Sequence, residues 1–401
     1  MTAYRESPDP VPMFLPLLRD GIDPVAELGQ VRASRPVARL DVPEGVPPVW
    51  LVTDHAGVRQ VLGDVTVFSN DLSHLAGTGL DDLAAQDPGG LGFTDPPRHT
   101  YLRRLLTPEF TARRLQALLP RVEAVVDERI DALVERGAPA DLVADFAIPV
   151  PSLVICELLG VPEEDRPHVE RLGAQRFDVL GSMEDSLTAV NASLDYLIGL
   201  VERFRSDPKP GLLARLMDDH GDALSDRQFA ELADGLLTGG HETTANMLAL
   251  GVLALLDRPE LADGLRSGDI RAEPFVDELL RHLTVVQVAF PRFARTATTV
   301  HDESVQAGDI VICSLSAANR DPVFGDDPER IDPARRPVPH LAFGHGVHRC
   351  LGAELGRMEL RVALTALLRR LPGLRLAEPR DALEFRMFSL VHGLRALPVT
   401  W

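Results

Sequence analysis

The sequence predicts a mainly α-helical fold with a small β lobe. The first observation is a helix-compatible pattern of about thirty residues, from 225 to about 256, which ends at Asp257-Arg258-Pro259. The second is an amphipathic helix that begins near Cys350 and keeps apolar residues at helical spacing as far as Leu368. The third is that strand-like runs are short, and we expect them at 36–41, 49–53, 292–298 and 309–313 and after Phe385.

Composition and length indicate a globular protein with a large core. The chain has 401 residues, of which 45% are hydrophobic and 25% charged. Length alone would allow two domains, but the Gly- and Pro-rich stretches at 77–92, 207–211 and 320–339 look like loops within one domain. We therefore expect a single domain over 1–401, with a poorly structured N-terminal segment at 1–20.

Charge and cysteine usage exclude several classes of partner and compartment. A formal net charge of −19 disfavours nucleic acid and anionic membrane surfaces as partners. No window offers the roughly eighteen uninterrupted apolar residues of a membrane span. Three dispersed cysteines, Cys156, Cys313 and Cys350, argue against a disulfide framework. We expect a soluble, cytoplasmic monomer.

The first chemically distinctive element follows the proline pair Pro96-Pro97. A helix that begins after these prolines places His99 and Arg103, four residues apart, on one face. This pair is a candidate site for an anionic group, although each residue by itself is more often a solvated surface charge.

The long helix from 225 opens with a capping box, because Ser225 is followed three residues later by Gln228. It is apolar nearly all round, so we expect it to cross the middle of the protein. In its interior stand the glycine pair 239–240 and the carboxylate Glu242. Each glycine costs roughly 1 kcal/mol relative to alanine in a helix. The bland interpretation is a tolerated packing defect, and the functional one is a site built into the helix.

The most informative stretch is 343–352, in which a glycine-rich turn is followed by Cys350 and then by the second helix. A cysteine at a helix N-terminus faces free backbone N–H groups, which stabilise its thiolate. A thiolate in a turn that can approach a flat ligand closely is what an axial haem ligand requires. The alternatives are a small buried hydrophobe, or a zinc site from residues whose spacing fits the usual patterns poorly: His340, His345, His348 and Cys350.

Residues 343–352 resemble the cysteine-ligand loop of the cytochrome P-450 superfamily, F-G-x-G-x-H-x-C-x-G, with every fixed position present. The resemblance covers the chain from about 32 to 401 and is nearest to soluble actinobacterial, class-I members. It implies the triangular, α-rich P-450 fold and haem b as cofactor. It implies that Cys350 ligates the iron and that Phe343 and Gly344 belong to the haem-binding loop.

The resemblance extends to the long helix and to the cations. Residues 239–244 resemble the family's oxygen-activating motif. This implies that Gly239 and Gly240 open a groove for O2, that Thr243 hydrogen-bonds the bound oxygen, and that Glu242 relays protons to it. A neutral thiolate-bound haem leaves two propionates to be paired. By resemblance their partners are His99, Arg103, Arg292 and His348.

A third motif is structural. Glu278 and Arg281 match the family's E-x-x-R, a weak pattern that 163–166 and 354–357 match too. It gains weight from the segment 319–335, which resembles the family's meander before the cysteine loop. The resemblance implies a buried ion-pair network of Glu278, Arg281 and Arg335 that fixes this loop.

The implied activity is monooxygenation: hydroxylation or epoxidation of a hydrophobic small molecule, a specialised metabolite of macrolide, terpenoid or sterol-like type. Electrons would come from a ferredoxin and its NAD(P)H-dependent reductase. Docking of that acidic carrier is also indicated by basic residues expected around the cysteine: Arg98, Arg104, Arg113, Arg114, Arg336, Arg349, Arg357 and Arg361. Two alternatives stay open, an oxidative coupling enzyme of the same type and a non-catalytic haem-thiolate sensor.

Substrate contacts are expected, by family position, from several separate segments. They are largely apolar, as a hydrophobic ligand requires. They comprise 72–91, 177–187, Leu236 with 239–243, 285–290 and 388–391.

Overall fold

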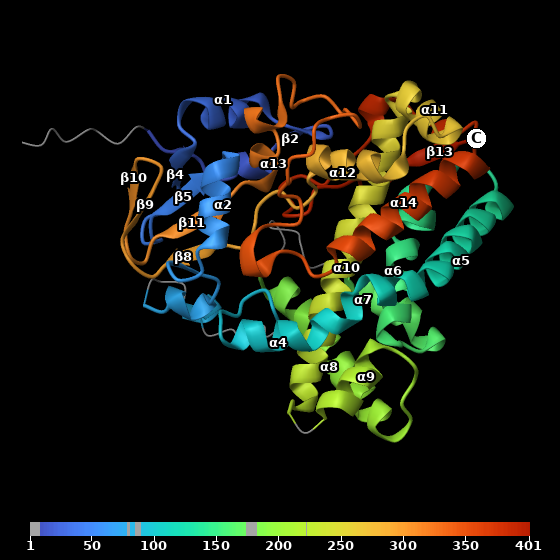
Figure 1. Ribbon diagram of the computed structural model, residues 1–401, viewed down its shortest axis with the longest axis horizontal. Helices are drawn as coiled ribbons and strands as arrows, with labels where there is room; N and C mark the ends of the chain where they lie inside the picture. The colour runs from blue at the N-terminus through green and yellow to red at the C-terminus, as the bar shows by residue number, and fades with distance from the viewer. Residues whose placement is uncertain (1–8, 78–80, 85–89, 174–182, 222) are drawn as a thin grey trace, which may run out of the picture.

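The computed structural model describes residues 9–77, 81–84, 90–173, 183–221 and 223–401. It confirms a mainly α-helical fold with a small β lobe, in which strands gather at one side of the molecule and long helices at the other (Figure 1). Within these residues no helix is both long and apolar enough to cross a membrane.

The main sheet of the β lobe joins the N-terminal part of the chain to residues 292–313. Its six strands lie in the order β1 (Val11–Pro12), β4 (Val37–Asp41), β5 (Val49–Val52), β11 (Ile310–Cys313), β8 (Arg292–Ala294) and β6 (Phe68–Ser69). β5 pairs antiparallel with β4 and parallel with β11, with Val49 opposite Ile310. Trp50 Nε1 donates to the Asp309 carboxylate at 2.7 Å across this junction. The sheet therefore ties the segment before Cys350 to the first fifty or so residues.

Three smaller sheets complete the lobe and its surroundings. β9 (Thr298–Val300) pairs with β10 (Glu303–Val305), β2 (Arg19–Asp20) with β3 (Asp23–Pro24), and β13 (Pro398–Thr400) lies between β12 (Arg375–Leu376) and β7 (Ala140–Asp141). The run expected at 292–298 is thus divided between β8 and the start of β9. After Phe385 the chain forms only isolated bridges in the described structure, Phe385 to Leu394 and Val391 to Val286, before β13 begins.

The N-terminal segment corrects the expectation of poor structure at 1–20, because residues 9–20 have a defined fold. They contain β1, the 3-10 helix η1 (Leu15–Leu17) and β2. Leu15 and Leu17 are buried, and buried Arg19 donates to Gln287 Oε1 at 2.7 Å and to the Thr284 carbonyl at 3.0 Å. Apolar burial and these long-range hydrogen bonds hold the segment against the rest of the chain.

Helices make up most of the regular structure in the described residues. In chain order they are α1 (Ala26–Ser34), α2 (His55–Gly63), α3 (Asp81–Ala84), α4 (Arg98–Leu106), α5 (Ala112–Arg136), α6 (Pro149–Leu159), α7 (Arg166–Gly173), α8 (Met183–Ser206), α9 (Leu212–His220), α10 (Asp226–Leu256), α11 (Pro259–Ser267), α12 (Ala272–Leu283), α13 (Leu315–Ala318) and α14 (Ala353–Arg370).

α10 is the central element, as the apolar pattern predicted. The capping box at Ser225 and Gln228 is present, with both of its reciprocal hydrogen bonds. The helix runs unbroken for 31 residues through the glycine pair and packs against α6, α8, α12 and α14 (Figure 1). The Gly239–Gly240 pair is accommodated without interrupting the helix.

Candidate active site

The turn that carries Cys350 is closed by its own backbone. Cys350 N–H donates to the Phe343 carbonyl at 2.8 Å, and Gly344 and Gly346 have φ of 69° and 72°. A Cβ on Gly346 would lie 2.3 Å from the Leu62 carbonyl oxygen of α2. Glycine is therefore required at this position both by its backbone conformation and by the close approach of α2.

The helix start differs from the sequence prediction. α14 begins at Ala353, with Gly352 at its N-cap, and so Cys350 precedes the first turn. The thiol is accessible, yet enough protein surrounds it for burial to raise its pKa, opposed by the Gly352 N–H and by nearby Arg103 and Arg349. The Gly352 N–H thus favours the thiolate, as expected for a cysteine beside a helix N-terminus, whereas burial favours the neutral thiol. A bound metal ion, which deprotonates a coordinating thiol, would reverse the balance.

Four nitrogen-bearing side chains predicted to bind propionates gather near this turn from three segments. His99 and Arg103 lie on α4, Arg292 on β8, and His348 in the turn itself. The rings of His99 and His348 have centroids 4.2 Å apart. Arg103 lies close enough to Cys350 to interact with it electrostatically, and His348 interacts in the same way with His99 and Arg292. The structure therefore brings this set and Cys350 into one cluster.

Several nitrogen atoms of this cluster have no partner in the described part of the chain. Both ring nitrogens of His99, Nε2 of His348 and Nε of Arg292 are buried and make no hydrogen bond to it. Burial lowers the pKa of both histidines, to about 3 for His348, and each neutral imidazole still carries one N–H donor. Buried polar groups are normally hydrogen-bonded, so the N–H groups of this cluster fit the oxygens of an anionic ligand. With the thiol beside them, they match a haem, which carries a metal and two carboxylates.

α10 presents an open face in its middle. Gly235 and Gly239 are exposed and Thr243 is half-buried, whereas most other residues of the helix are buried. These positions recur every four residues and share a face. Among the described residues, a Cβ on Gly239 would meet no atom within 4 Å, whereas one on Gly240 would lie 3.1 Å from Ile155. The open groove predicted for both glycines therefore belongs to Gly239, and Gly240 allows close packing against α6.

Glu242 and Thr243, which follow His241 on α10, face different surroundings. Thr243 Oγ1 donates to the Gly239 carbonyl at 2.7 Å, at the edge of the open face. The Glu242 side chain is buried, and its Oε1 accepts from Arg386. Burial raises the pKa of Glu242, and Arg386 opposes this shift. Sequence reasoning missed Arg386; the only signal was a lone arginine beside the apolar segment 388–391.

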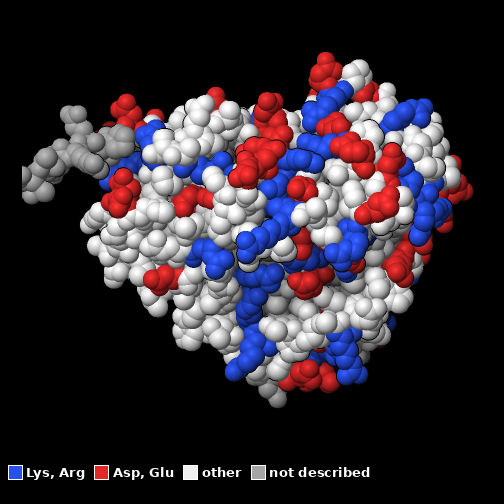
Figure 2. All heavy atoms as spheres, turned by 45° about the horizontal axis from the view of Figure 1, so that its top comes forward, with Lys and Arg blue, Asp and Glu red and all other residues white. Residues whose placement is uncertain are grey.

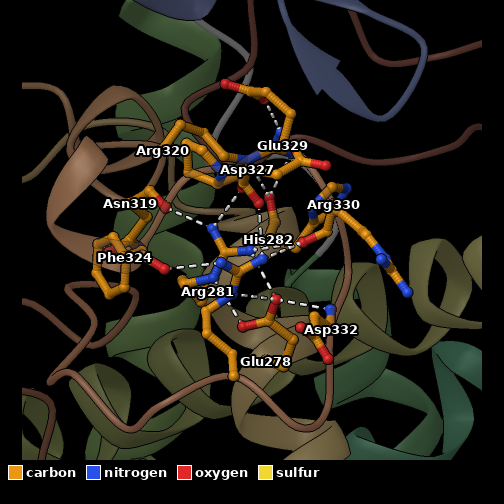
Figure 3. A network of polar contacts seen from close by, with 12 residues as sticks. Glu278, Arg281, His282, Asn319, Arg320, Phe324, Asp327, Glu329, Arg330 and Asp332 are labelled. Atoms are coloured by element: carbon orange, nitrogen blue, oxygen red, sulfur yellow. Dashed lines mark hydrogen bonds and ion pairs between the residues drawn. The ribbon is translucent and has the colours of Figure 1, made fainter.

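A buried network holds the segment that leads to the cysteine (Figure 3). Arg281 and Glu278 form a two-pronged ion pair at 2.8 Å, and Arg335 reaches Glu278 at 3.0 Å, as predicted. Arg281 also donates to the carbonyls of Asn319 at 2.7 Å and Pro328 at 2.9 Å. Asn319 Oδ1 in turn accepts from the Leu341 N–H at 2.7 Å. The network thus extends to the residue two before Phe343.

A second part of the network was not predicted. Buried Arg320 pairs with Asp23 at 2.7 Å and with Glu329, and it donates to the His282 carbonyl at 2.9 Å. Figure 3 shows Arg320 above Arg281. Arg320 binds the carbonyl at the end of α12, whereas Arg281 binds carbonyls of the segment 319–330. Asp23 belongs to β3, which means that the N-terminal hairpin is anchored to the support of the cysteine turn.

The predicted substrate segments are described in part. Residues 78–80 and 85–89 of the segment 72–91, and 177–182 of the segment 177–187, lie outside the described residues. The segments 285–290 and 388–391 lie side by side, because Gln287 N–H donates to the Leu390 carbonyl at 3.0 Å and Val286 bridges to Val391. Phe388 has a φ of 55°, a strained conformation for a bulky residue.

Comparison with known proteins bears on this arrangement. The family model for Cytochrome P450 matches residues 272–391. The chain is 40% identical to Cytochrome P450 165B3 of Amycolatopsis orientalis, over 98% of this chain and 99% of the relative. It is 39% identical to Mycinamicin IV hydroxylase/epoxidase of Micromonospora griseorubida, over 95% and 96%.

A solved structure shares both the fold and the sequence. It is that of OxyC, a cytochrome P450 implicated in an oxidative C–C coupling reaction during vancomycin biosynthesis. The TM-score is 0.88 at 36% identity, over 99% of each chain. Full-length similarity at this level, together with the cysteine turn and its donor cluster, determines the family. The chain belongs to the cytochrome P450 family and is a monooxygenase whose cofactor is haem b.

Proposed function

We propose that the protein inserts one oxygen atom from O2 into a hydrophobic specialised metabolite, by hydroxylation or epoxidation. The observation that carries this proposal is the acid–alcohol pair of α10. Glu242 has a buried carboxyl whose pKa is raised, and Thr243 places a hydroxyl at the open face of the helix. A titratable acid next to a hydroxyl is a means of moving protons to a site from which bulk water is excluded. The mycinamicin relative, named as a hydroxylase/epoxidase, supports the same reaction.

The residues of the donor cluster would hold the cofactor. Cys350 would ligate the iron, and Phe343 and Gly344 would shape the turn beside it. His99, Arg103, Arg292 and His348 would bind the propionates. Buried nitrogen atoms of His99, Arg292 and His348 have no partner in the described chain. When bound, the haem supplies an iron that binds O2 and activates it.

The residues of α10 would control protons and access. Gly239 leaves room beside the helix, and Thr243 can turn its hydroxyl from the Gly239 carbonyl toward that space. Glu242 would give a proton toward Thr243 and recover it from solvent. The apolar segments 285–290 and 388–391 would exclude water and contact the substrate.

A second candidate function is oxidative coupling of a substrate without oxygen insertion. The observation that favours it is the match to OxyC over nearly the whole chain. Coupling needs the same cofactor site, so the residues described here fit it equally well. Insertion and coupling differ in their products: one oxygen atom gained in the first, and two hydrogen atoms lost in the second.

Isotope labelling distinguishes these reactions. Holoprotein, ferredoxin, ferredoxin reductase and NADPH are incubated under oxygen-18 gas with macrolides, terpenoids, sterols and phenolic peptides that shift the haem absorption on binding. A product with one labelled oxygen is expected. A product that has lost two hydrogens and carries no label would replace insertion by coupling. Binding without turnover of any bound compound would contradict both and favour a sensor.

We further propose that the chain forms one domain, acts as a monomer in the cytoplasm and receives electrons from a ferredoxin. The first proposal is supported by α10, which packs against α6, α8, α12 and α14. All three cysteines are free, as expected in a reducing compartment. The electron carrier is supported by the band of basic side chains across the face on which α4 and α14 lie (Figure 1 and Figure 2).

A further inference from the structure

The carboxylate of Glu242 is held from a distant part of the chain. Its Oε1 pairs with Nη1 of Arg386, 144 residues away, and the side chains are 7% and 23% exposed. Oε2 is buried and has no hydrogen-bond partner in the described chain. Arg386 is therefore the charged group on which the ionised form of this acid depends.

The segment that carries Arg386 is a hairpin pressed against α10. Arg386 N–H donates to the Gly393 carbonyl at 2.8 Å, and Arg395 N–H donates to Glu384 at 2.9 Å. A Cβ on Gly393 would lie 1.6 Å from Oδ1 of Asn246, so only glycine allows this approach. Asn246 Nδ2 also donates to the backbone carbonyl of Glu242 at 2.9 Å. The hairpin backbone thus places the guanidinium at the turn of α10 that carries the acid.

The other titratable groups near Glu242 that are described do not supply a charge to it. His241, next to Glu242 on α10, donates to the Ile148 carbonyl, and burial lowers its pKa to about 4. His392, on the hairpin, contacts the Gly21 carbonyl at 2.8 Å, and burial lowers its pKa to about 3. Both are neutral near pH 7. Glu359 on α14 is buried and has no charged partner among the described residues. In the described chain, Arg386 is the charged group that shifts the pKa of Glu242.

We propose that Arg386 is a positioning residue that aims the Glu242 carboxyl and stabilises the carboxylate left after each proton donation. The inference rests on the proton-relay role proposed for Glu242. In each cycle the O–H bond of Glu242 breaks, its proton moves toward Thr243, and a proton from solvent restores the acid. Without the Arg386 guanidinium, nothing would offset the cost of desolvating the Glu242 carboxylate, and the carboxyl would hold its proton more tightly.

The test compares Arg386→Gln with Arg386→Lys, and with Arg395→Gln as a matched control. Arg395 lies on the same hairpin, is exposed, and reaches Glu384 only at 4.0 Å. The titration of Glu242 is followed in the holoprotein by difference infrared spectroscopy, with Glu242→Gln to assign the carboxyl band. The solvent deuterium isotope effect on kcat is measured alongside KM.

Arg386→Gln is expected to move the Glu242 titration to higher pH. It should lower kcat roughly tenfold, raise the isotope effect and leave KM unchanged. Arg386→Lys should restore most of kcat, and Arg395→Gln should match the wild type. In a Glu242→Gln background, Arg386→Gln should have no further effect on kcat. If Arg386→Gln lowered kcat by reducing folding, the loss would appear in this background too, so the comparison separates the two causes.

An unchanged infrared titration and isotope effect in Arg386→Gln would overturn the inference. So would a kcat loss in Arg386→Gln that persists undiminished when Glu242 is already glutamine. If instead Glu242→Gln retains the wild-type kcat and isotope effect, the relay role of Glu242 fails. The shift in the infrared titration of Glu242 caused by Arg386→Gln would then still show whether Arg386 stabilises the ionised carboxylate.

Discussion

At the scale of single residues, the candidate site depends on neighbours that face different surroundings. Thr243 lies at the open face of α10, whereas Glu242 is buried against the hairpin. The same contrast holds in the cysteine turn, where Gly346 packs against α2 and Cys350 stays accessible. Consecutive helical residues point about 100° apart, which allows one short motif to serve both a ligand space and a proton path.

Replacing Thr243 by alanine tests the hydroxyl. We expect Thr243→Ala to lower the product formed per NADPH by roughly tenfold, because a proton donor is removed while the fold is kept. Thr365→Ala is the matched control, since Thr365 Oγ1 also donates to a carbonyl four residues earlier, at 2.6 Å. Product and NADPH are quantified together. Unchanged coupling in Thr243→Ala would refute the assigned role.

Glu359 gives a pH prediction. Its carboxyl is fully buried on α14, Oε2 has no partner in the described chain, and burial raises its pKa well above the usual value. A raised folded-state pKa means that the folded form binds its proton more tightly than the unfolded chain does. The resulting stability is present below the unfolded pKa of about 4.3 and is lost as pH rises toward the folded pKa.

The measurement is denaturant unfolding of holoprotein across neutral and alkaline pH. The free energy of unfolding of Glu359→Gln, relative to wild type, should increase with pH, because glutamine cannot ionise. A pH-independent difference between the two proteins would show that Glu359 does not titrate in this way.

At the scale of elements, α12 and the meander behave as one unit. Arg281 is 2% exposed and Glu278 6%, and they bind backbone carbonyls and an N–H as well as each other. A buried ion pair of this kind is weak evidence for net stability, but its hydrogen bonds define one arrangement of the chain. The arrangement positions the segment before Cys350.

Removal of one partner should therefore be costly. We expect Glu278→Ala to lower the free energy of unfolding by about 3–5 kcal/mol, because it leaves the buried guanidinium of Arg281 and the partly buried one of Arg335 without their carboxylate. Asp263→Ala breaks the exposed pair with Arg266, which has the same spacing, and should cost at most about 1 kcal/mol. Equal losses in the two variants, measured by denaturant unfolding, would contradict a buried network.

At the scale of the whole molecule, charge is distributed unevenly. The net charge is −19, yet arginines form a band across the face that carries α4 and α14 (Figure 2). Several of these arginines also have acidic partners, such as Arg357 with Asp277 at 2.6 Å. Arg104 and Arg113 are exposed and are the better probes of docking, because changing them leaves the cysteine turn intact.

We expect Arg104→Glu with Arg113→Glu to slow reduction by an acidic ferredoxin by roughly tenfold at low salt, since charge steers association. Substrate affinity, read from the shift of the haem absorption, should not change. Arg375→Glu, on the exposed strand β12, is the control. Loss of both reduction rate and substrate affinity would mean that the double variant disturbs the fold rather than the docking.

The sequence by itself determined the features that depend on near neighbours. The capping box at Ser225, the length of α10, the turn at Cys350 and the Glu278–Arg281 pair are each recorded within a few residues of chain, because helix and turn geometry relates such neighbours directly. The family resemblance rested on the same contiguous motifs.

Only the tertiary structure decided the partners that come from distant segments. Arg386 meets Glu242, His99 meets His348, and Arg320 meets Asp23 because hairpin, sheet and helices pack in one particular way. No local periodicity encodes those relative positions. They follow from burial of apolar surface by the whole chain. For this reason only the folded structure identifies Arg386 as the partner of Glu242.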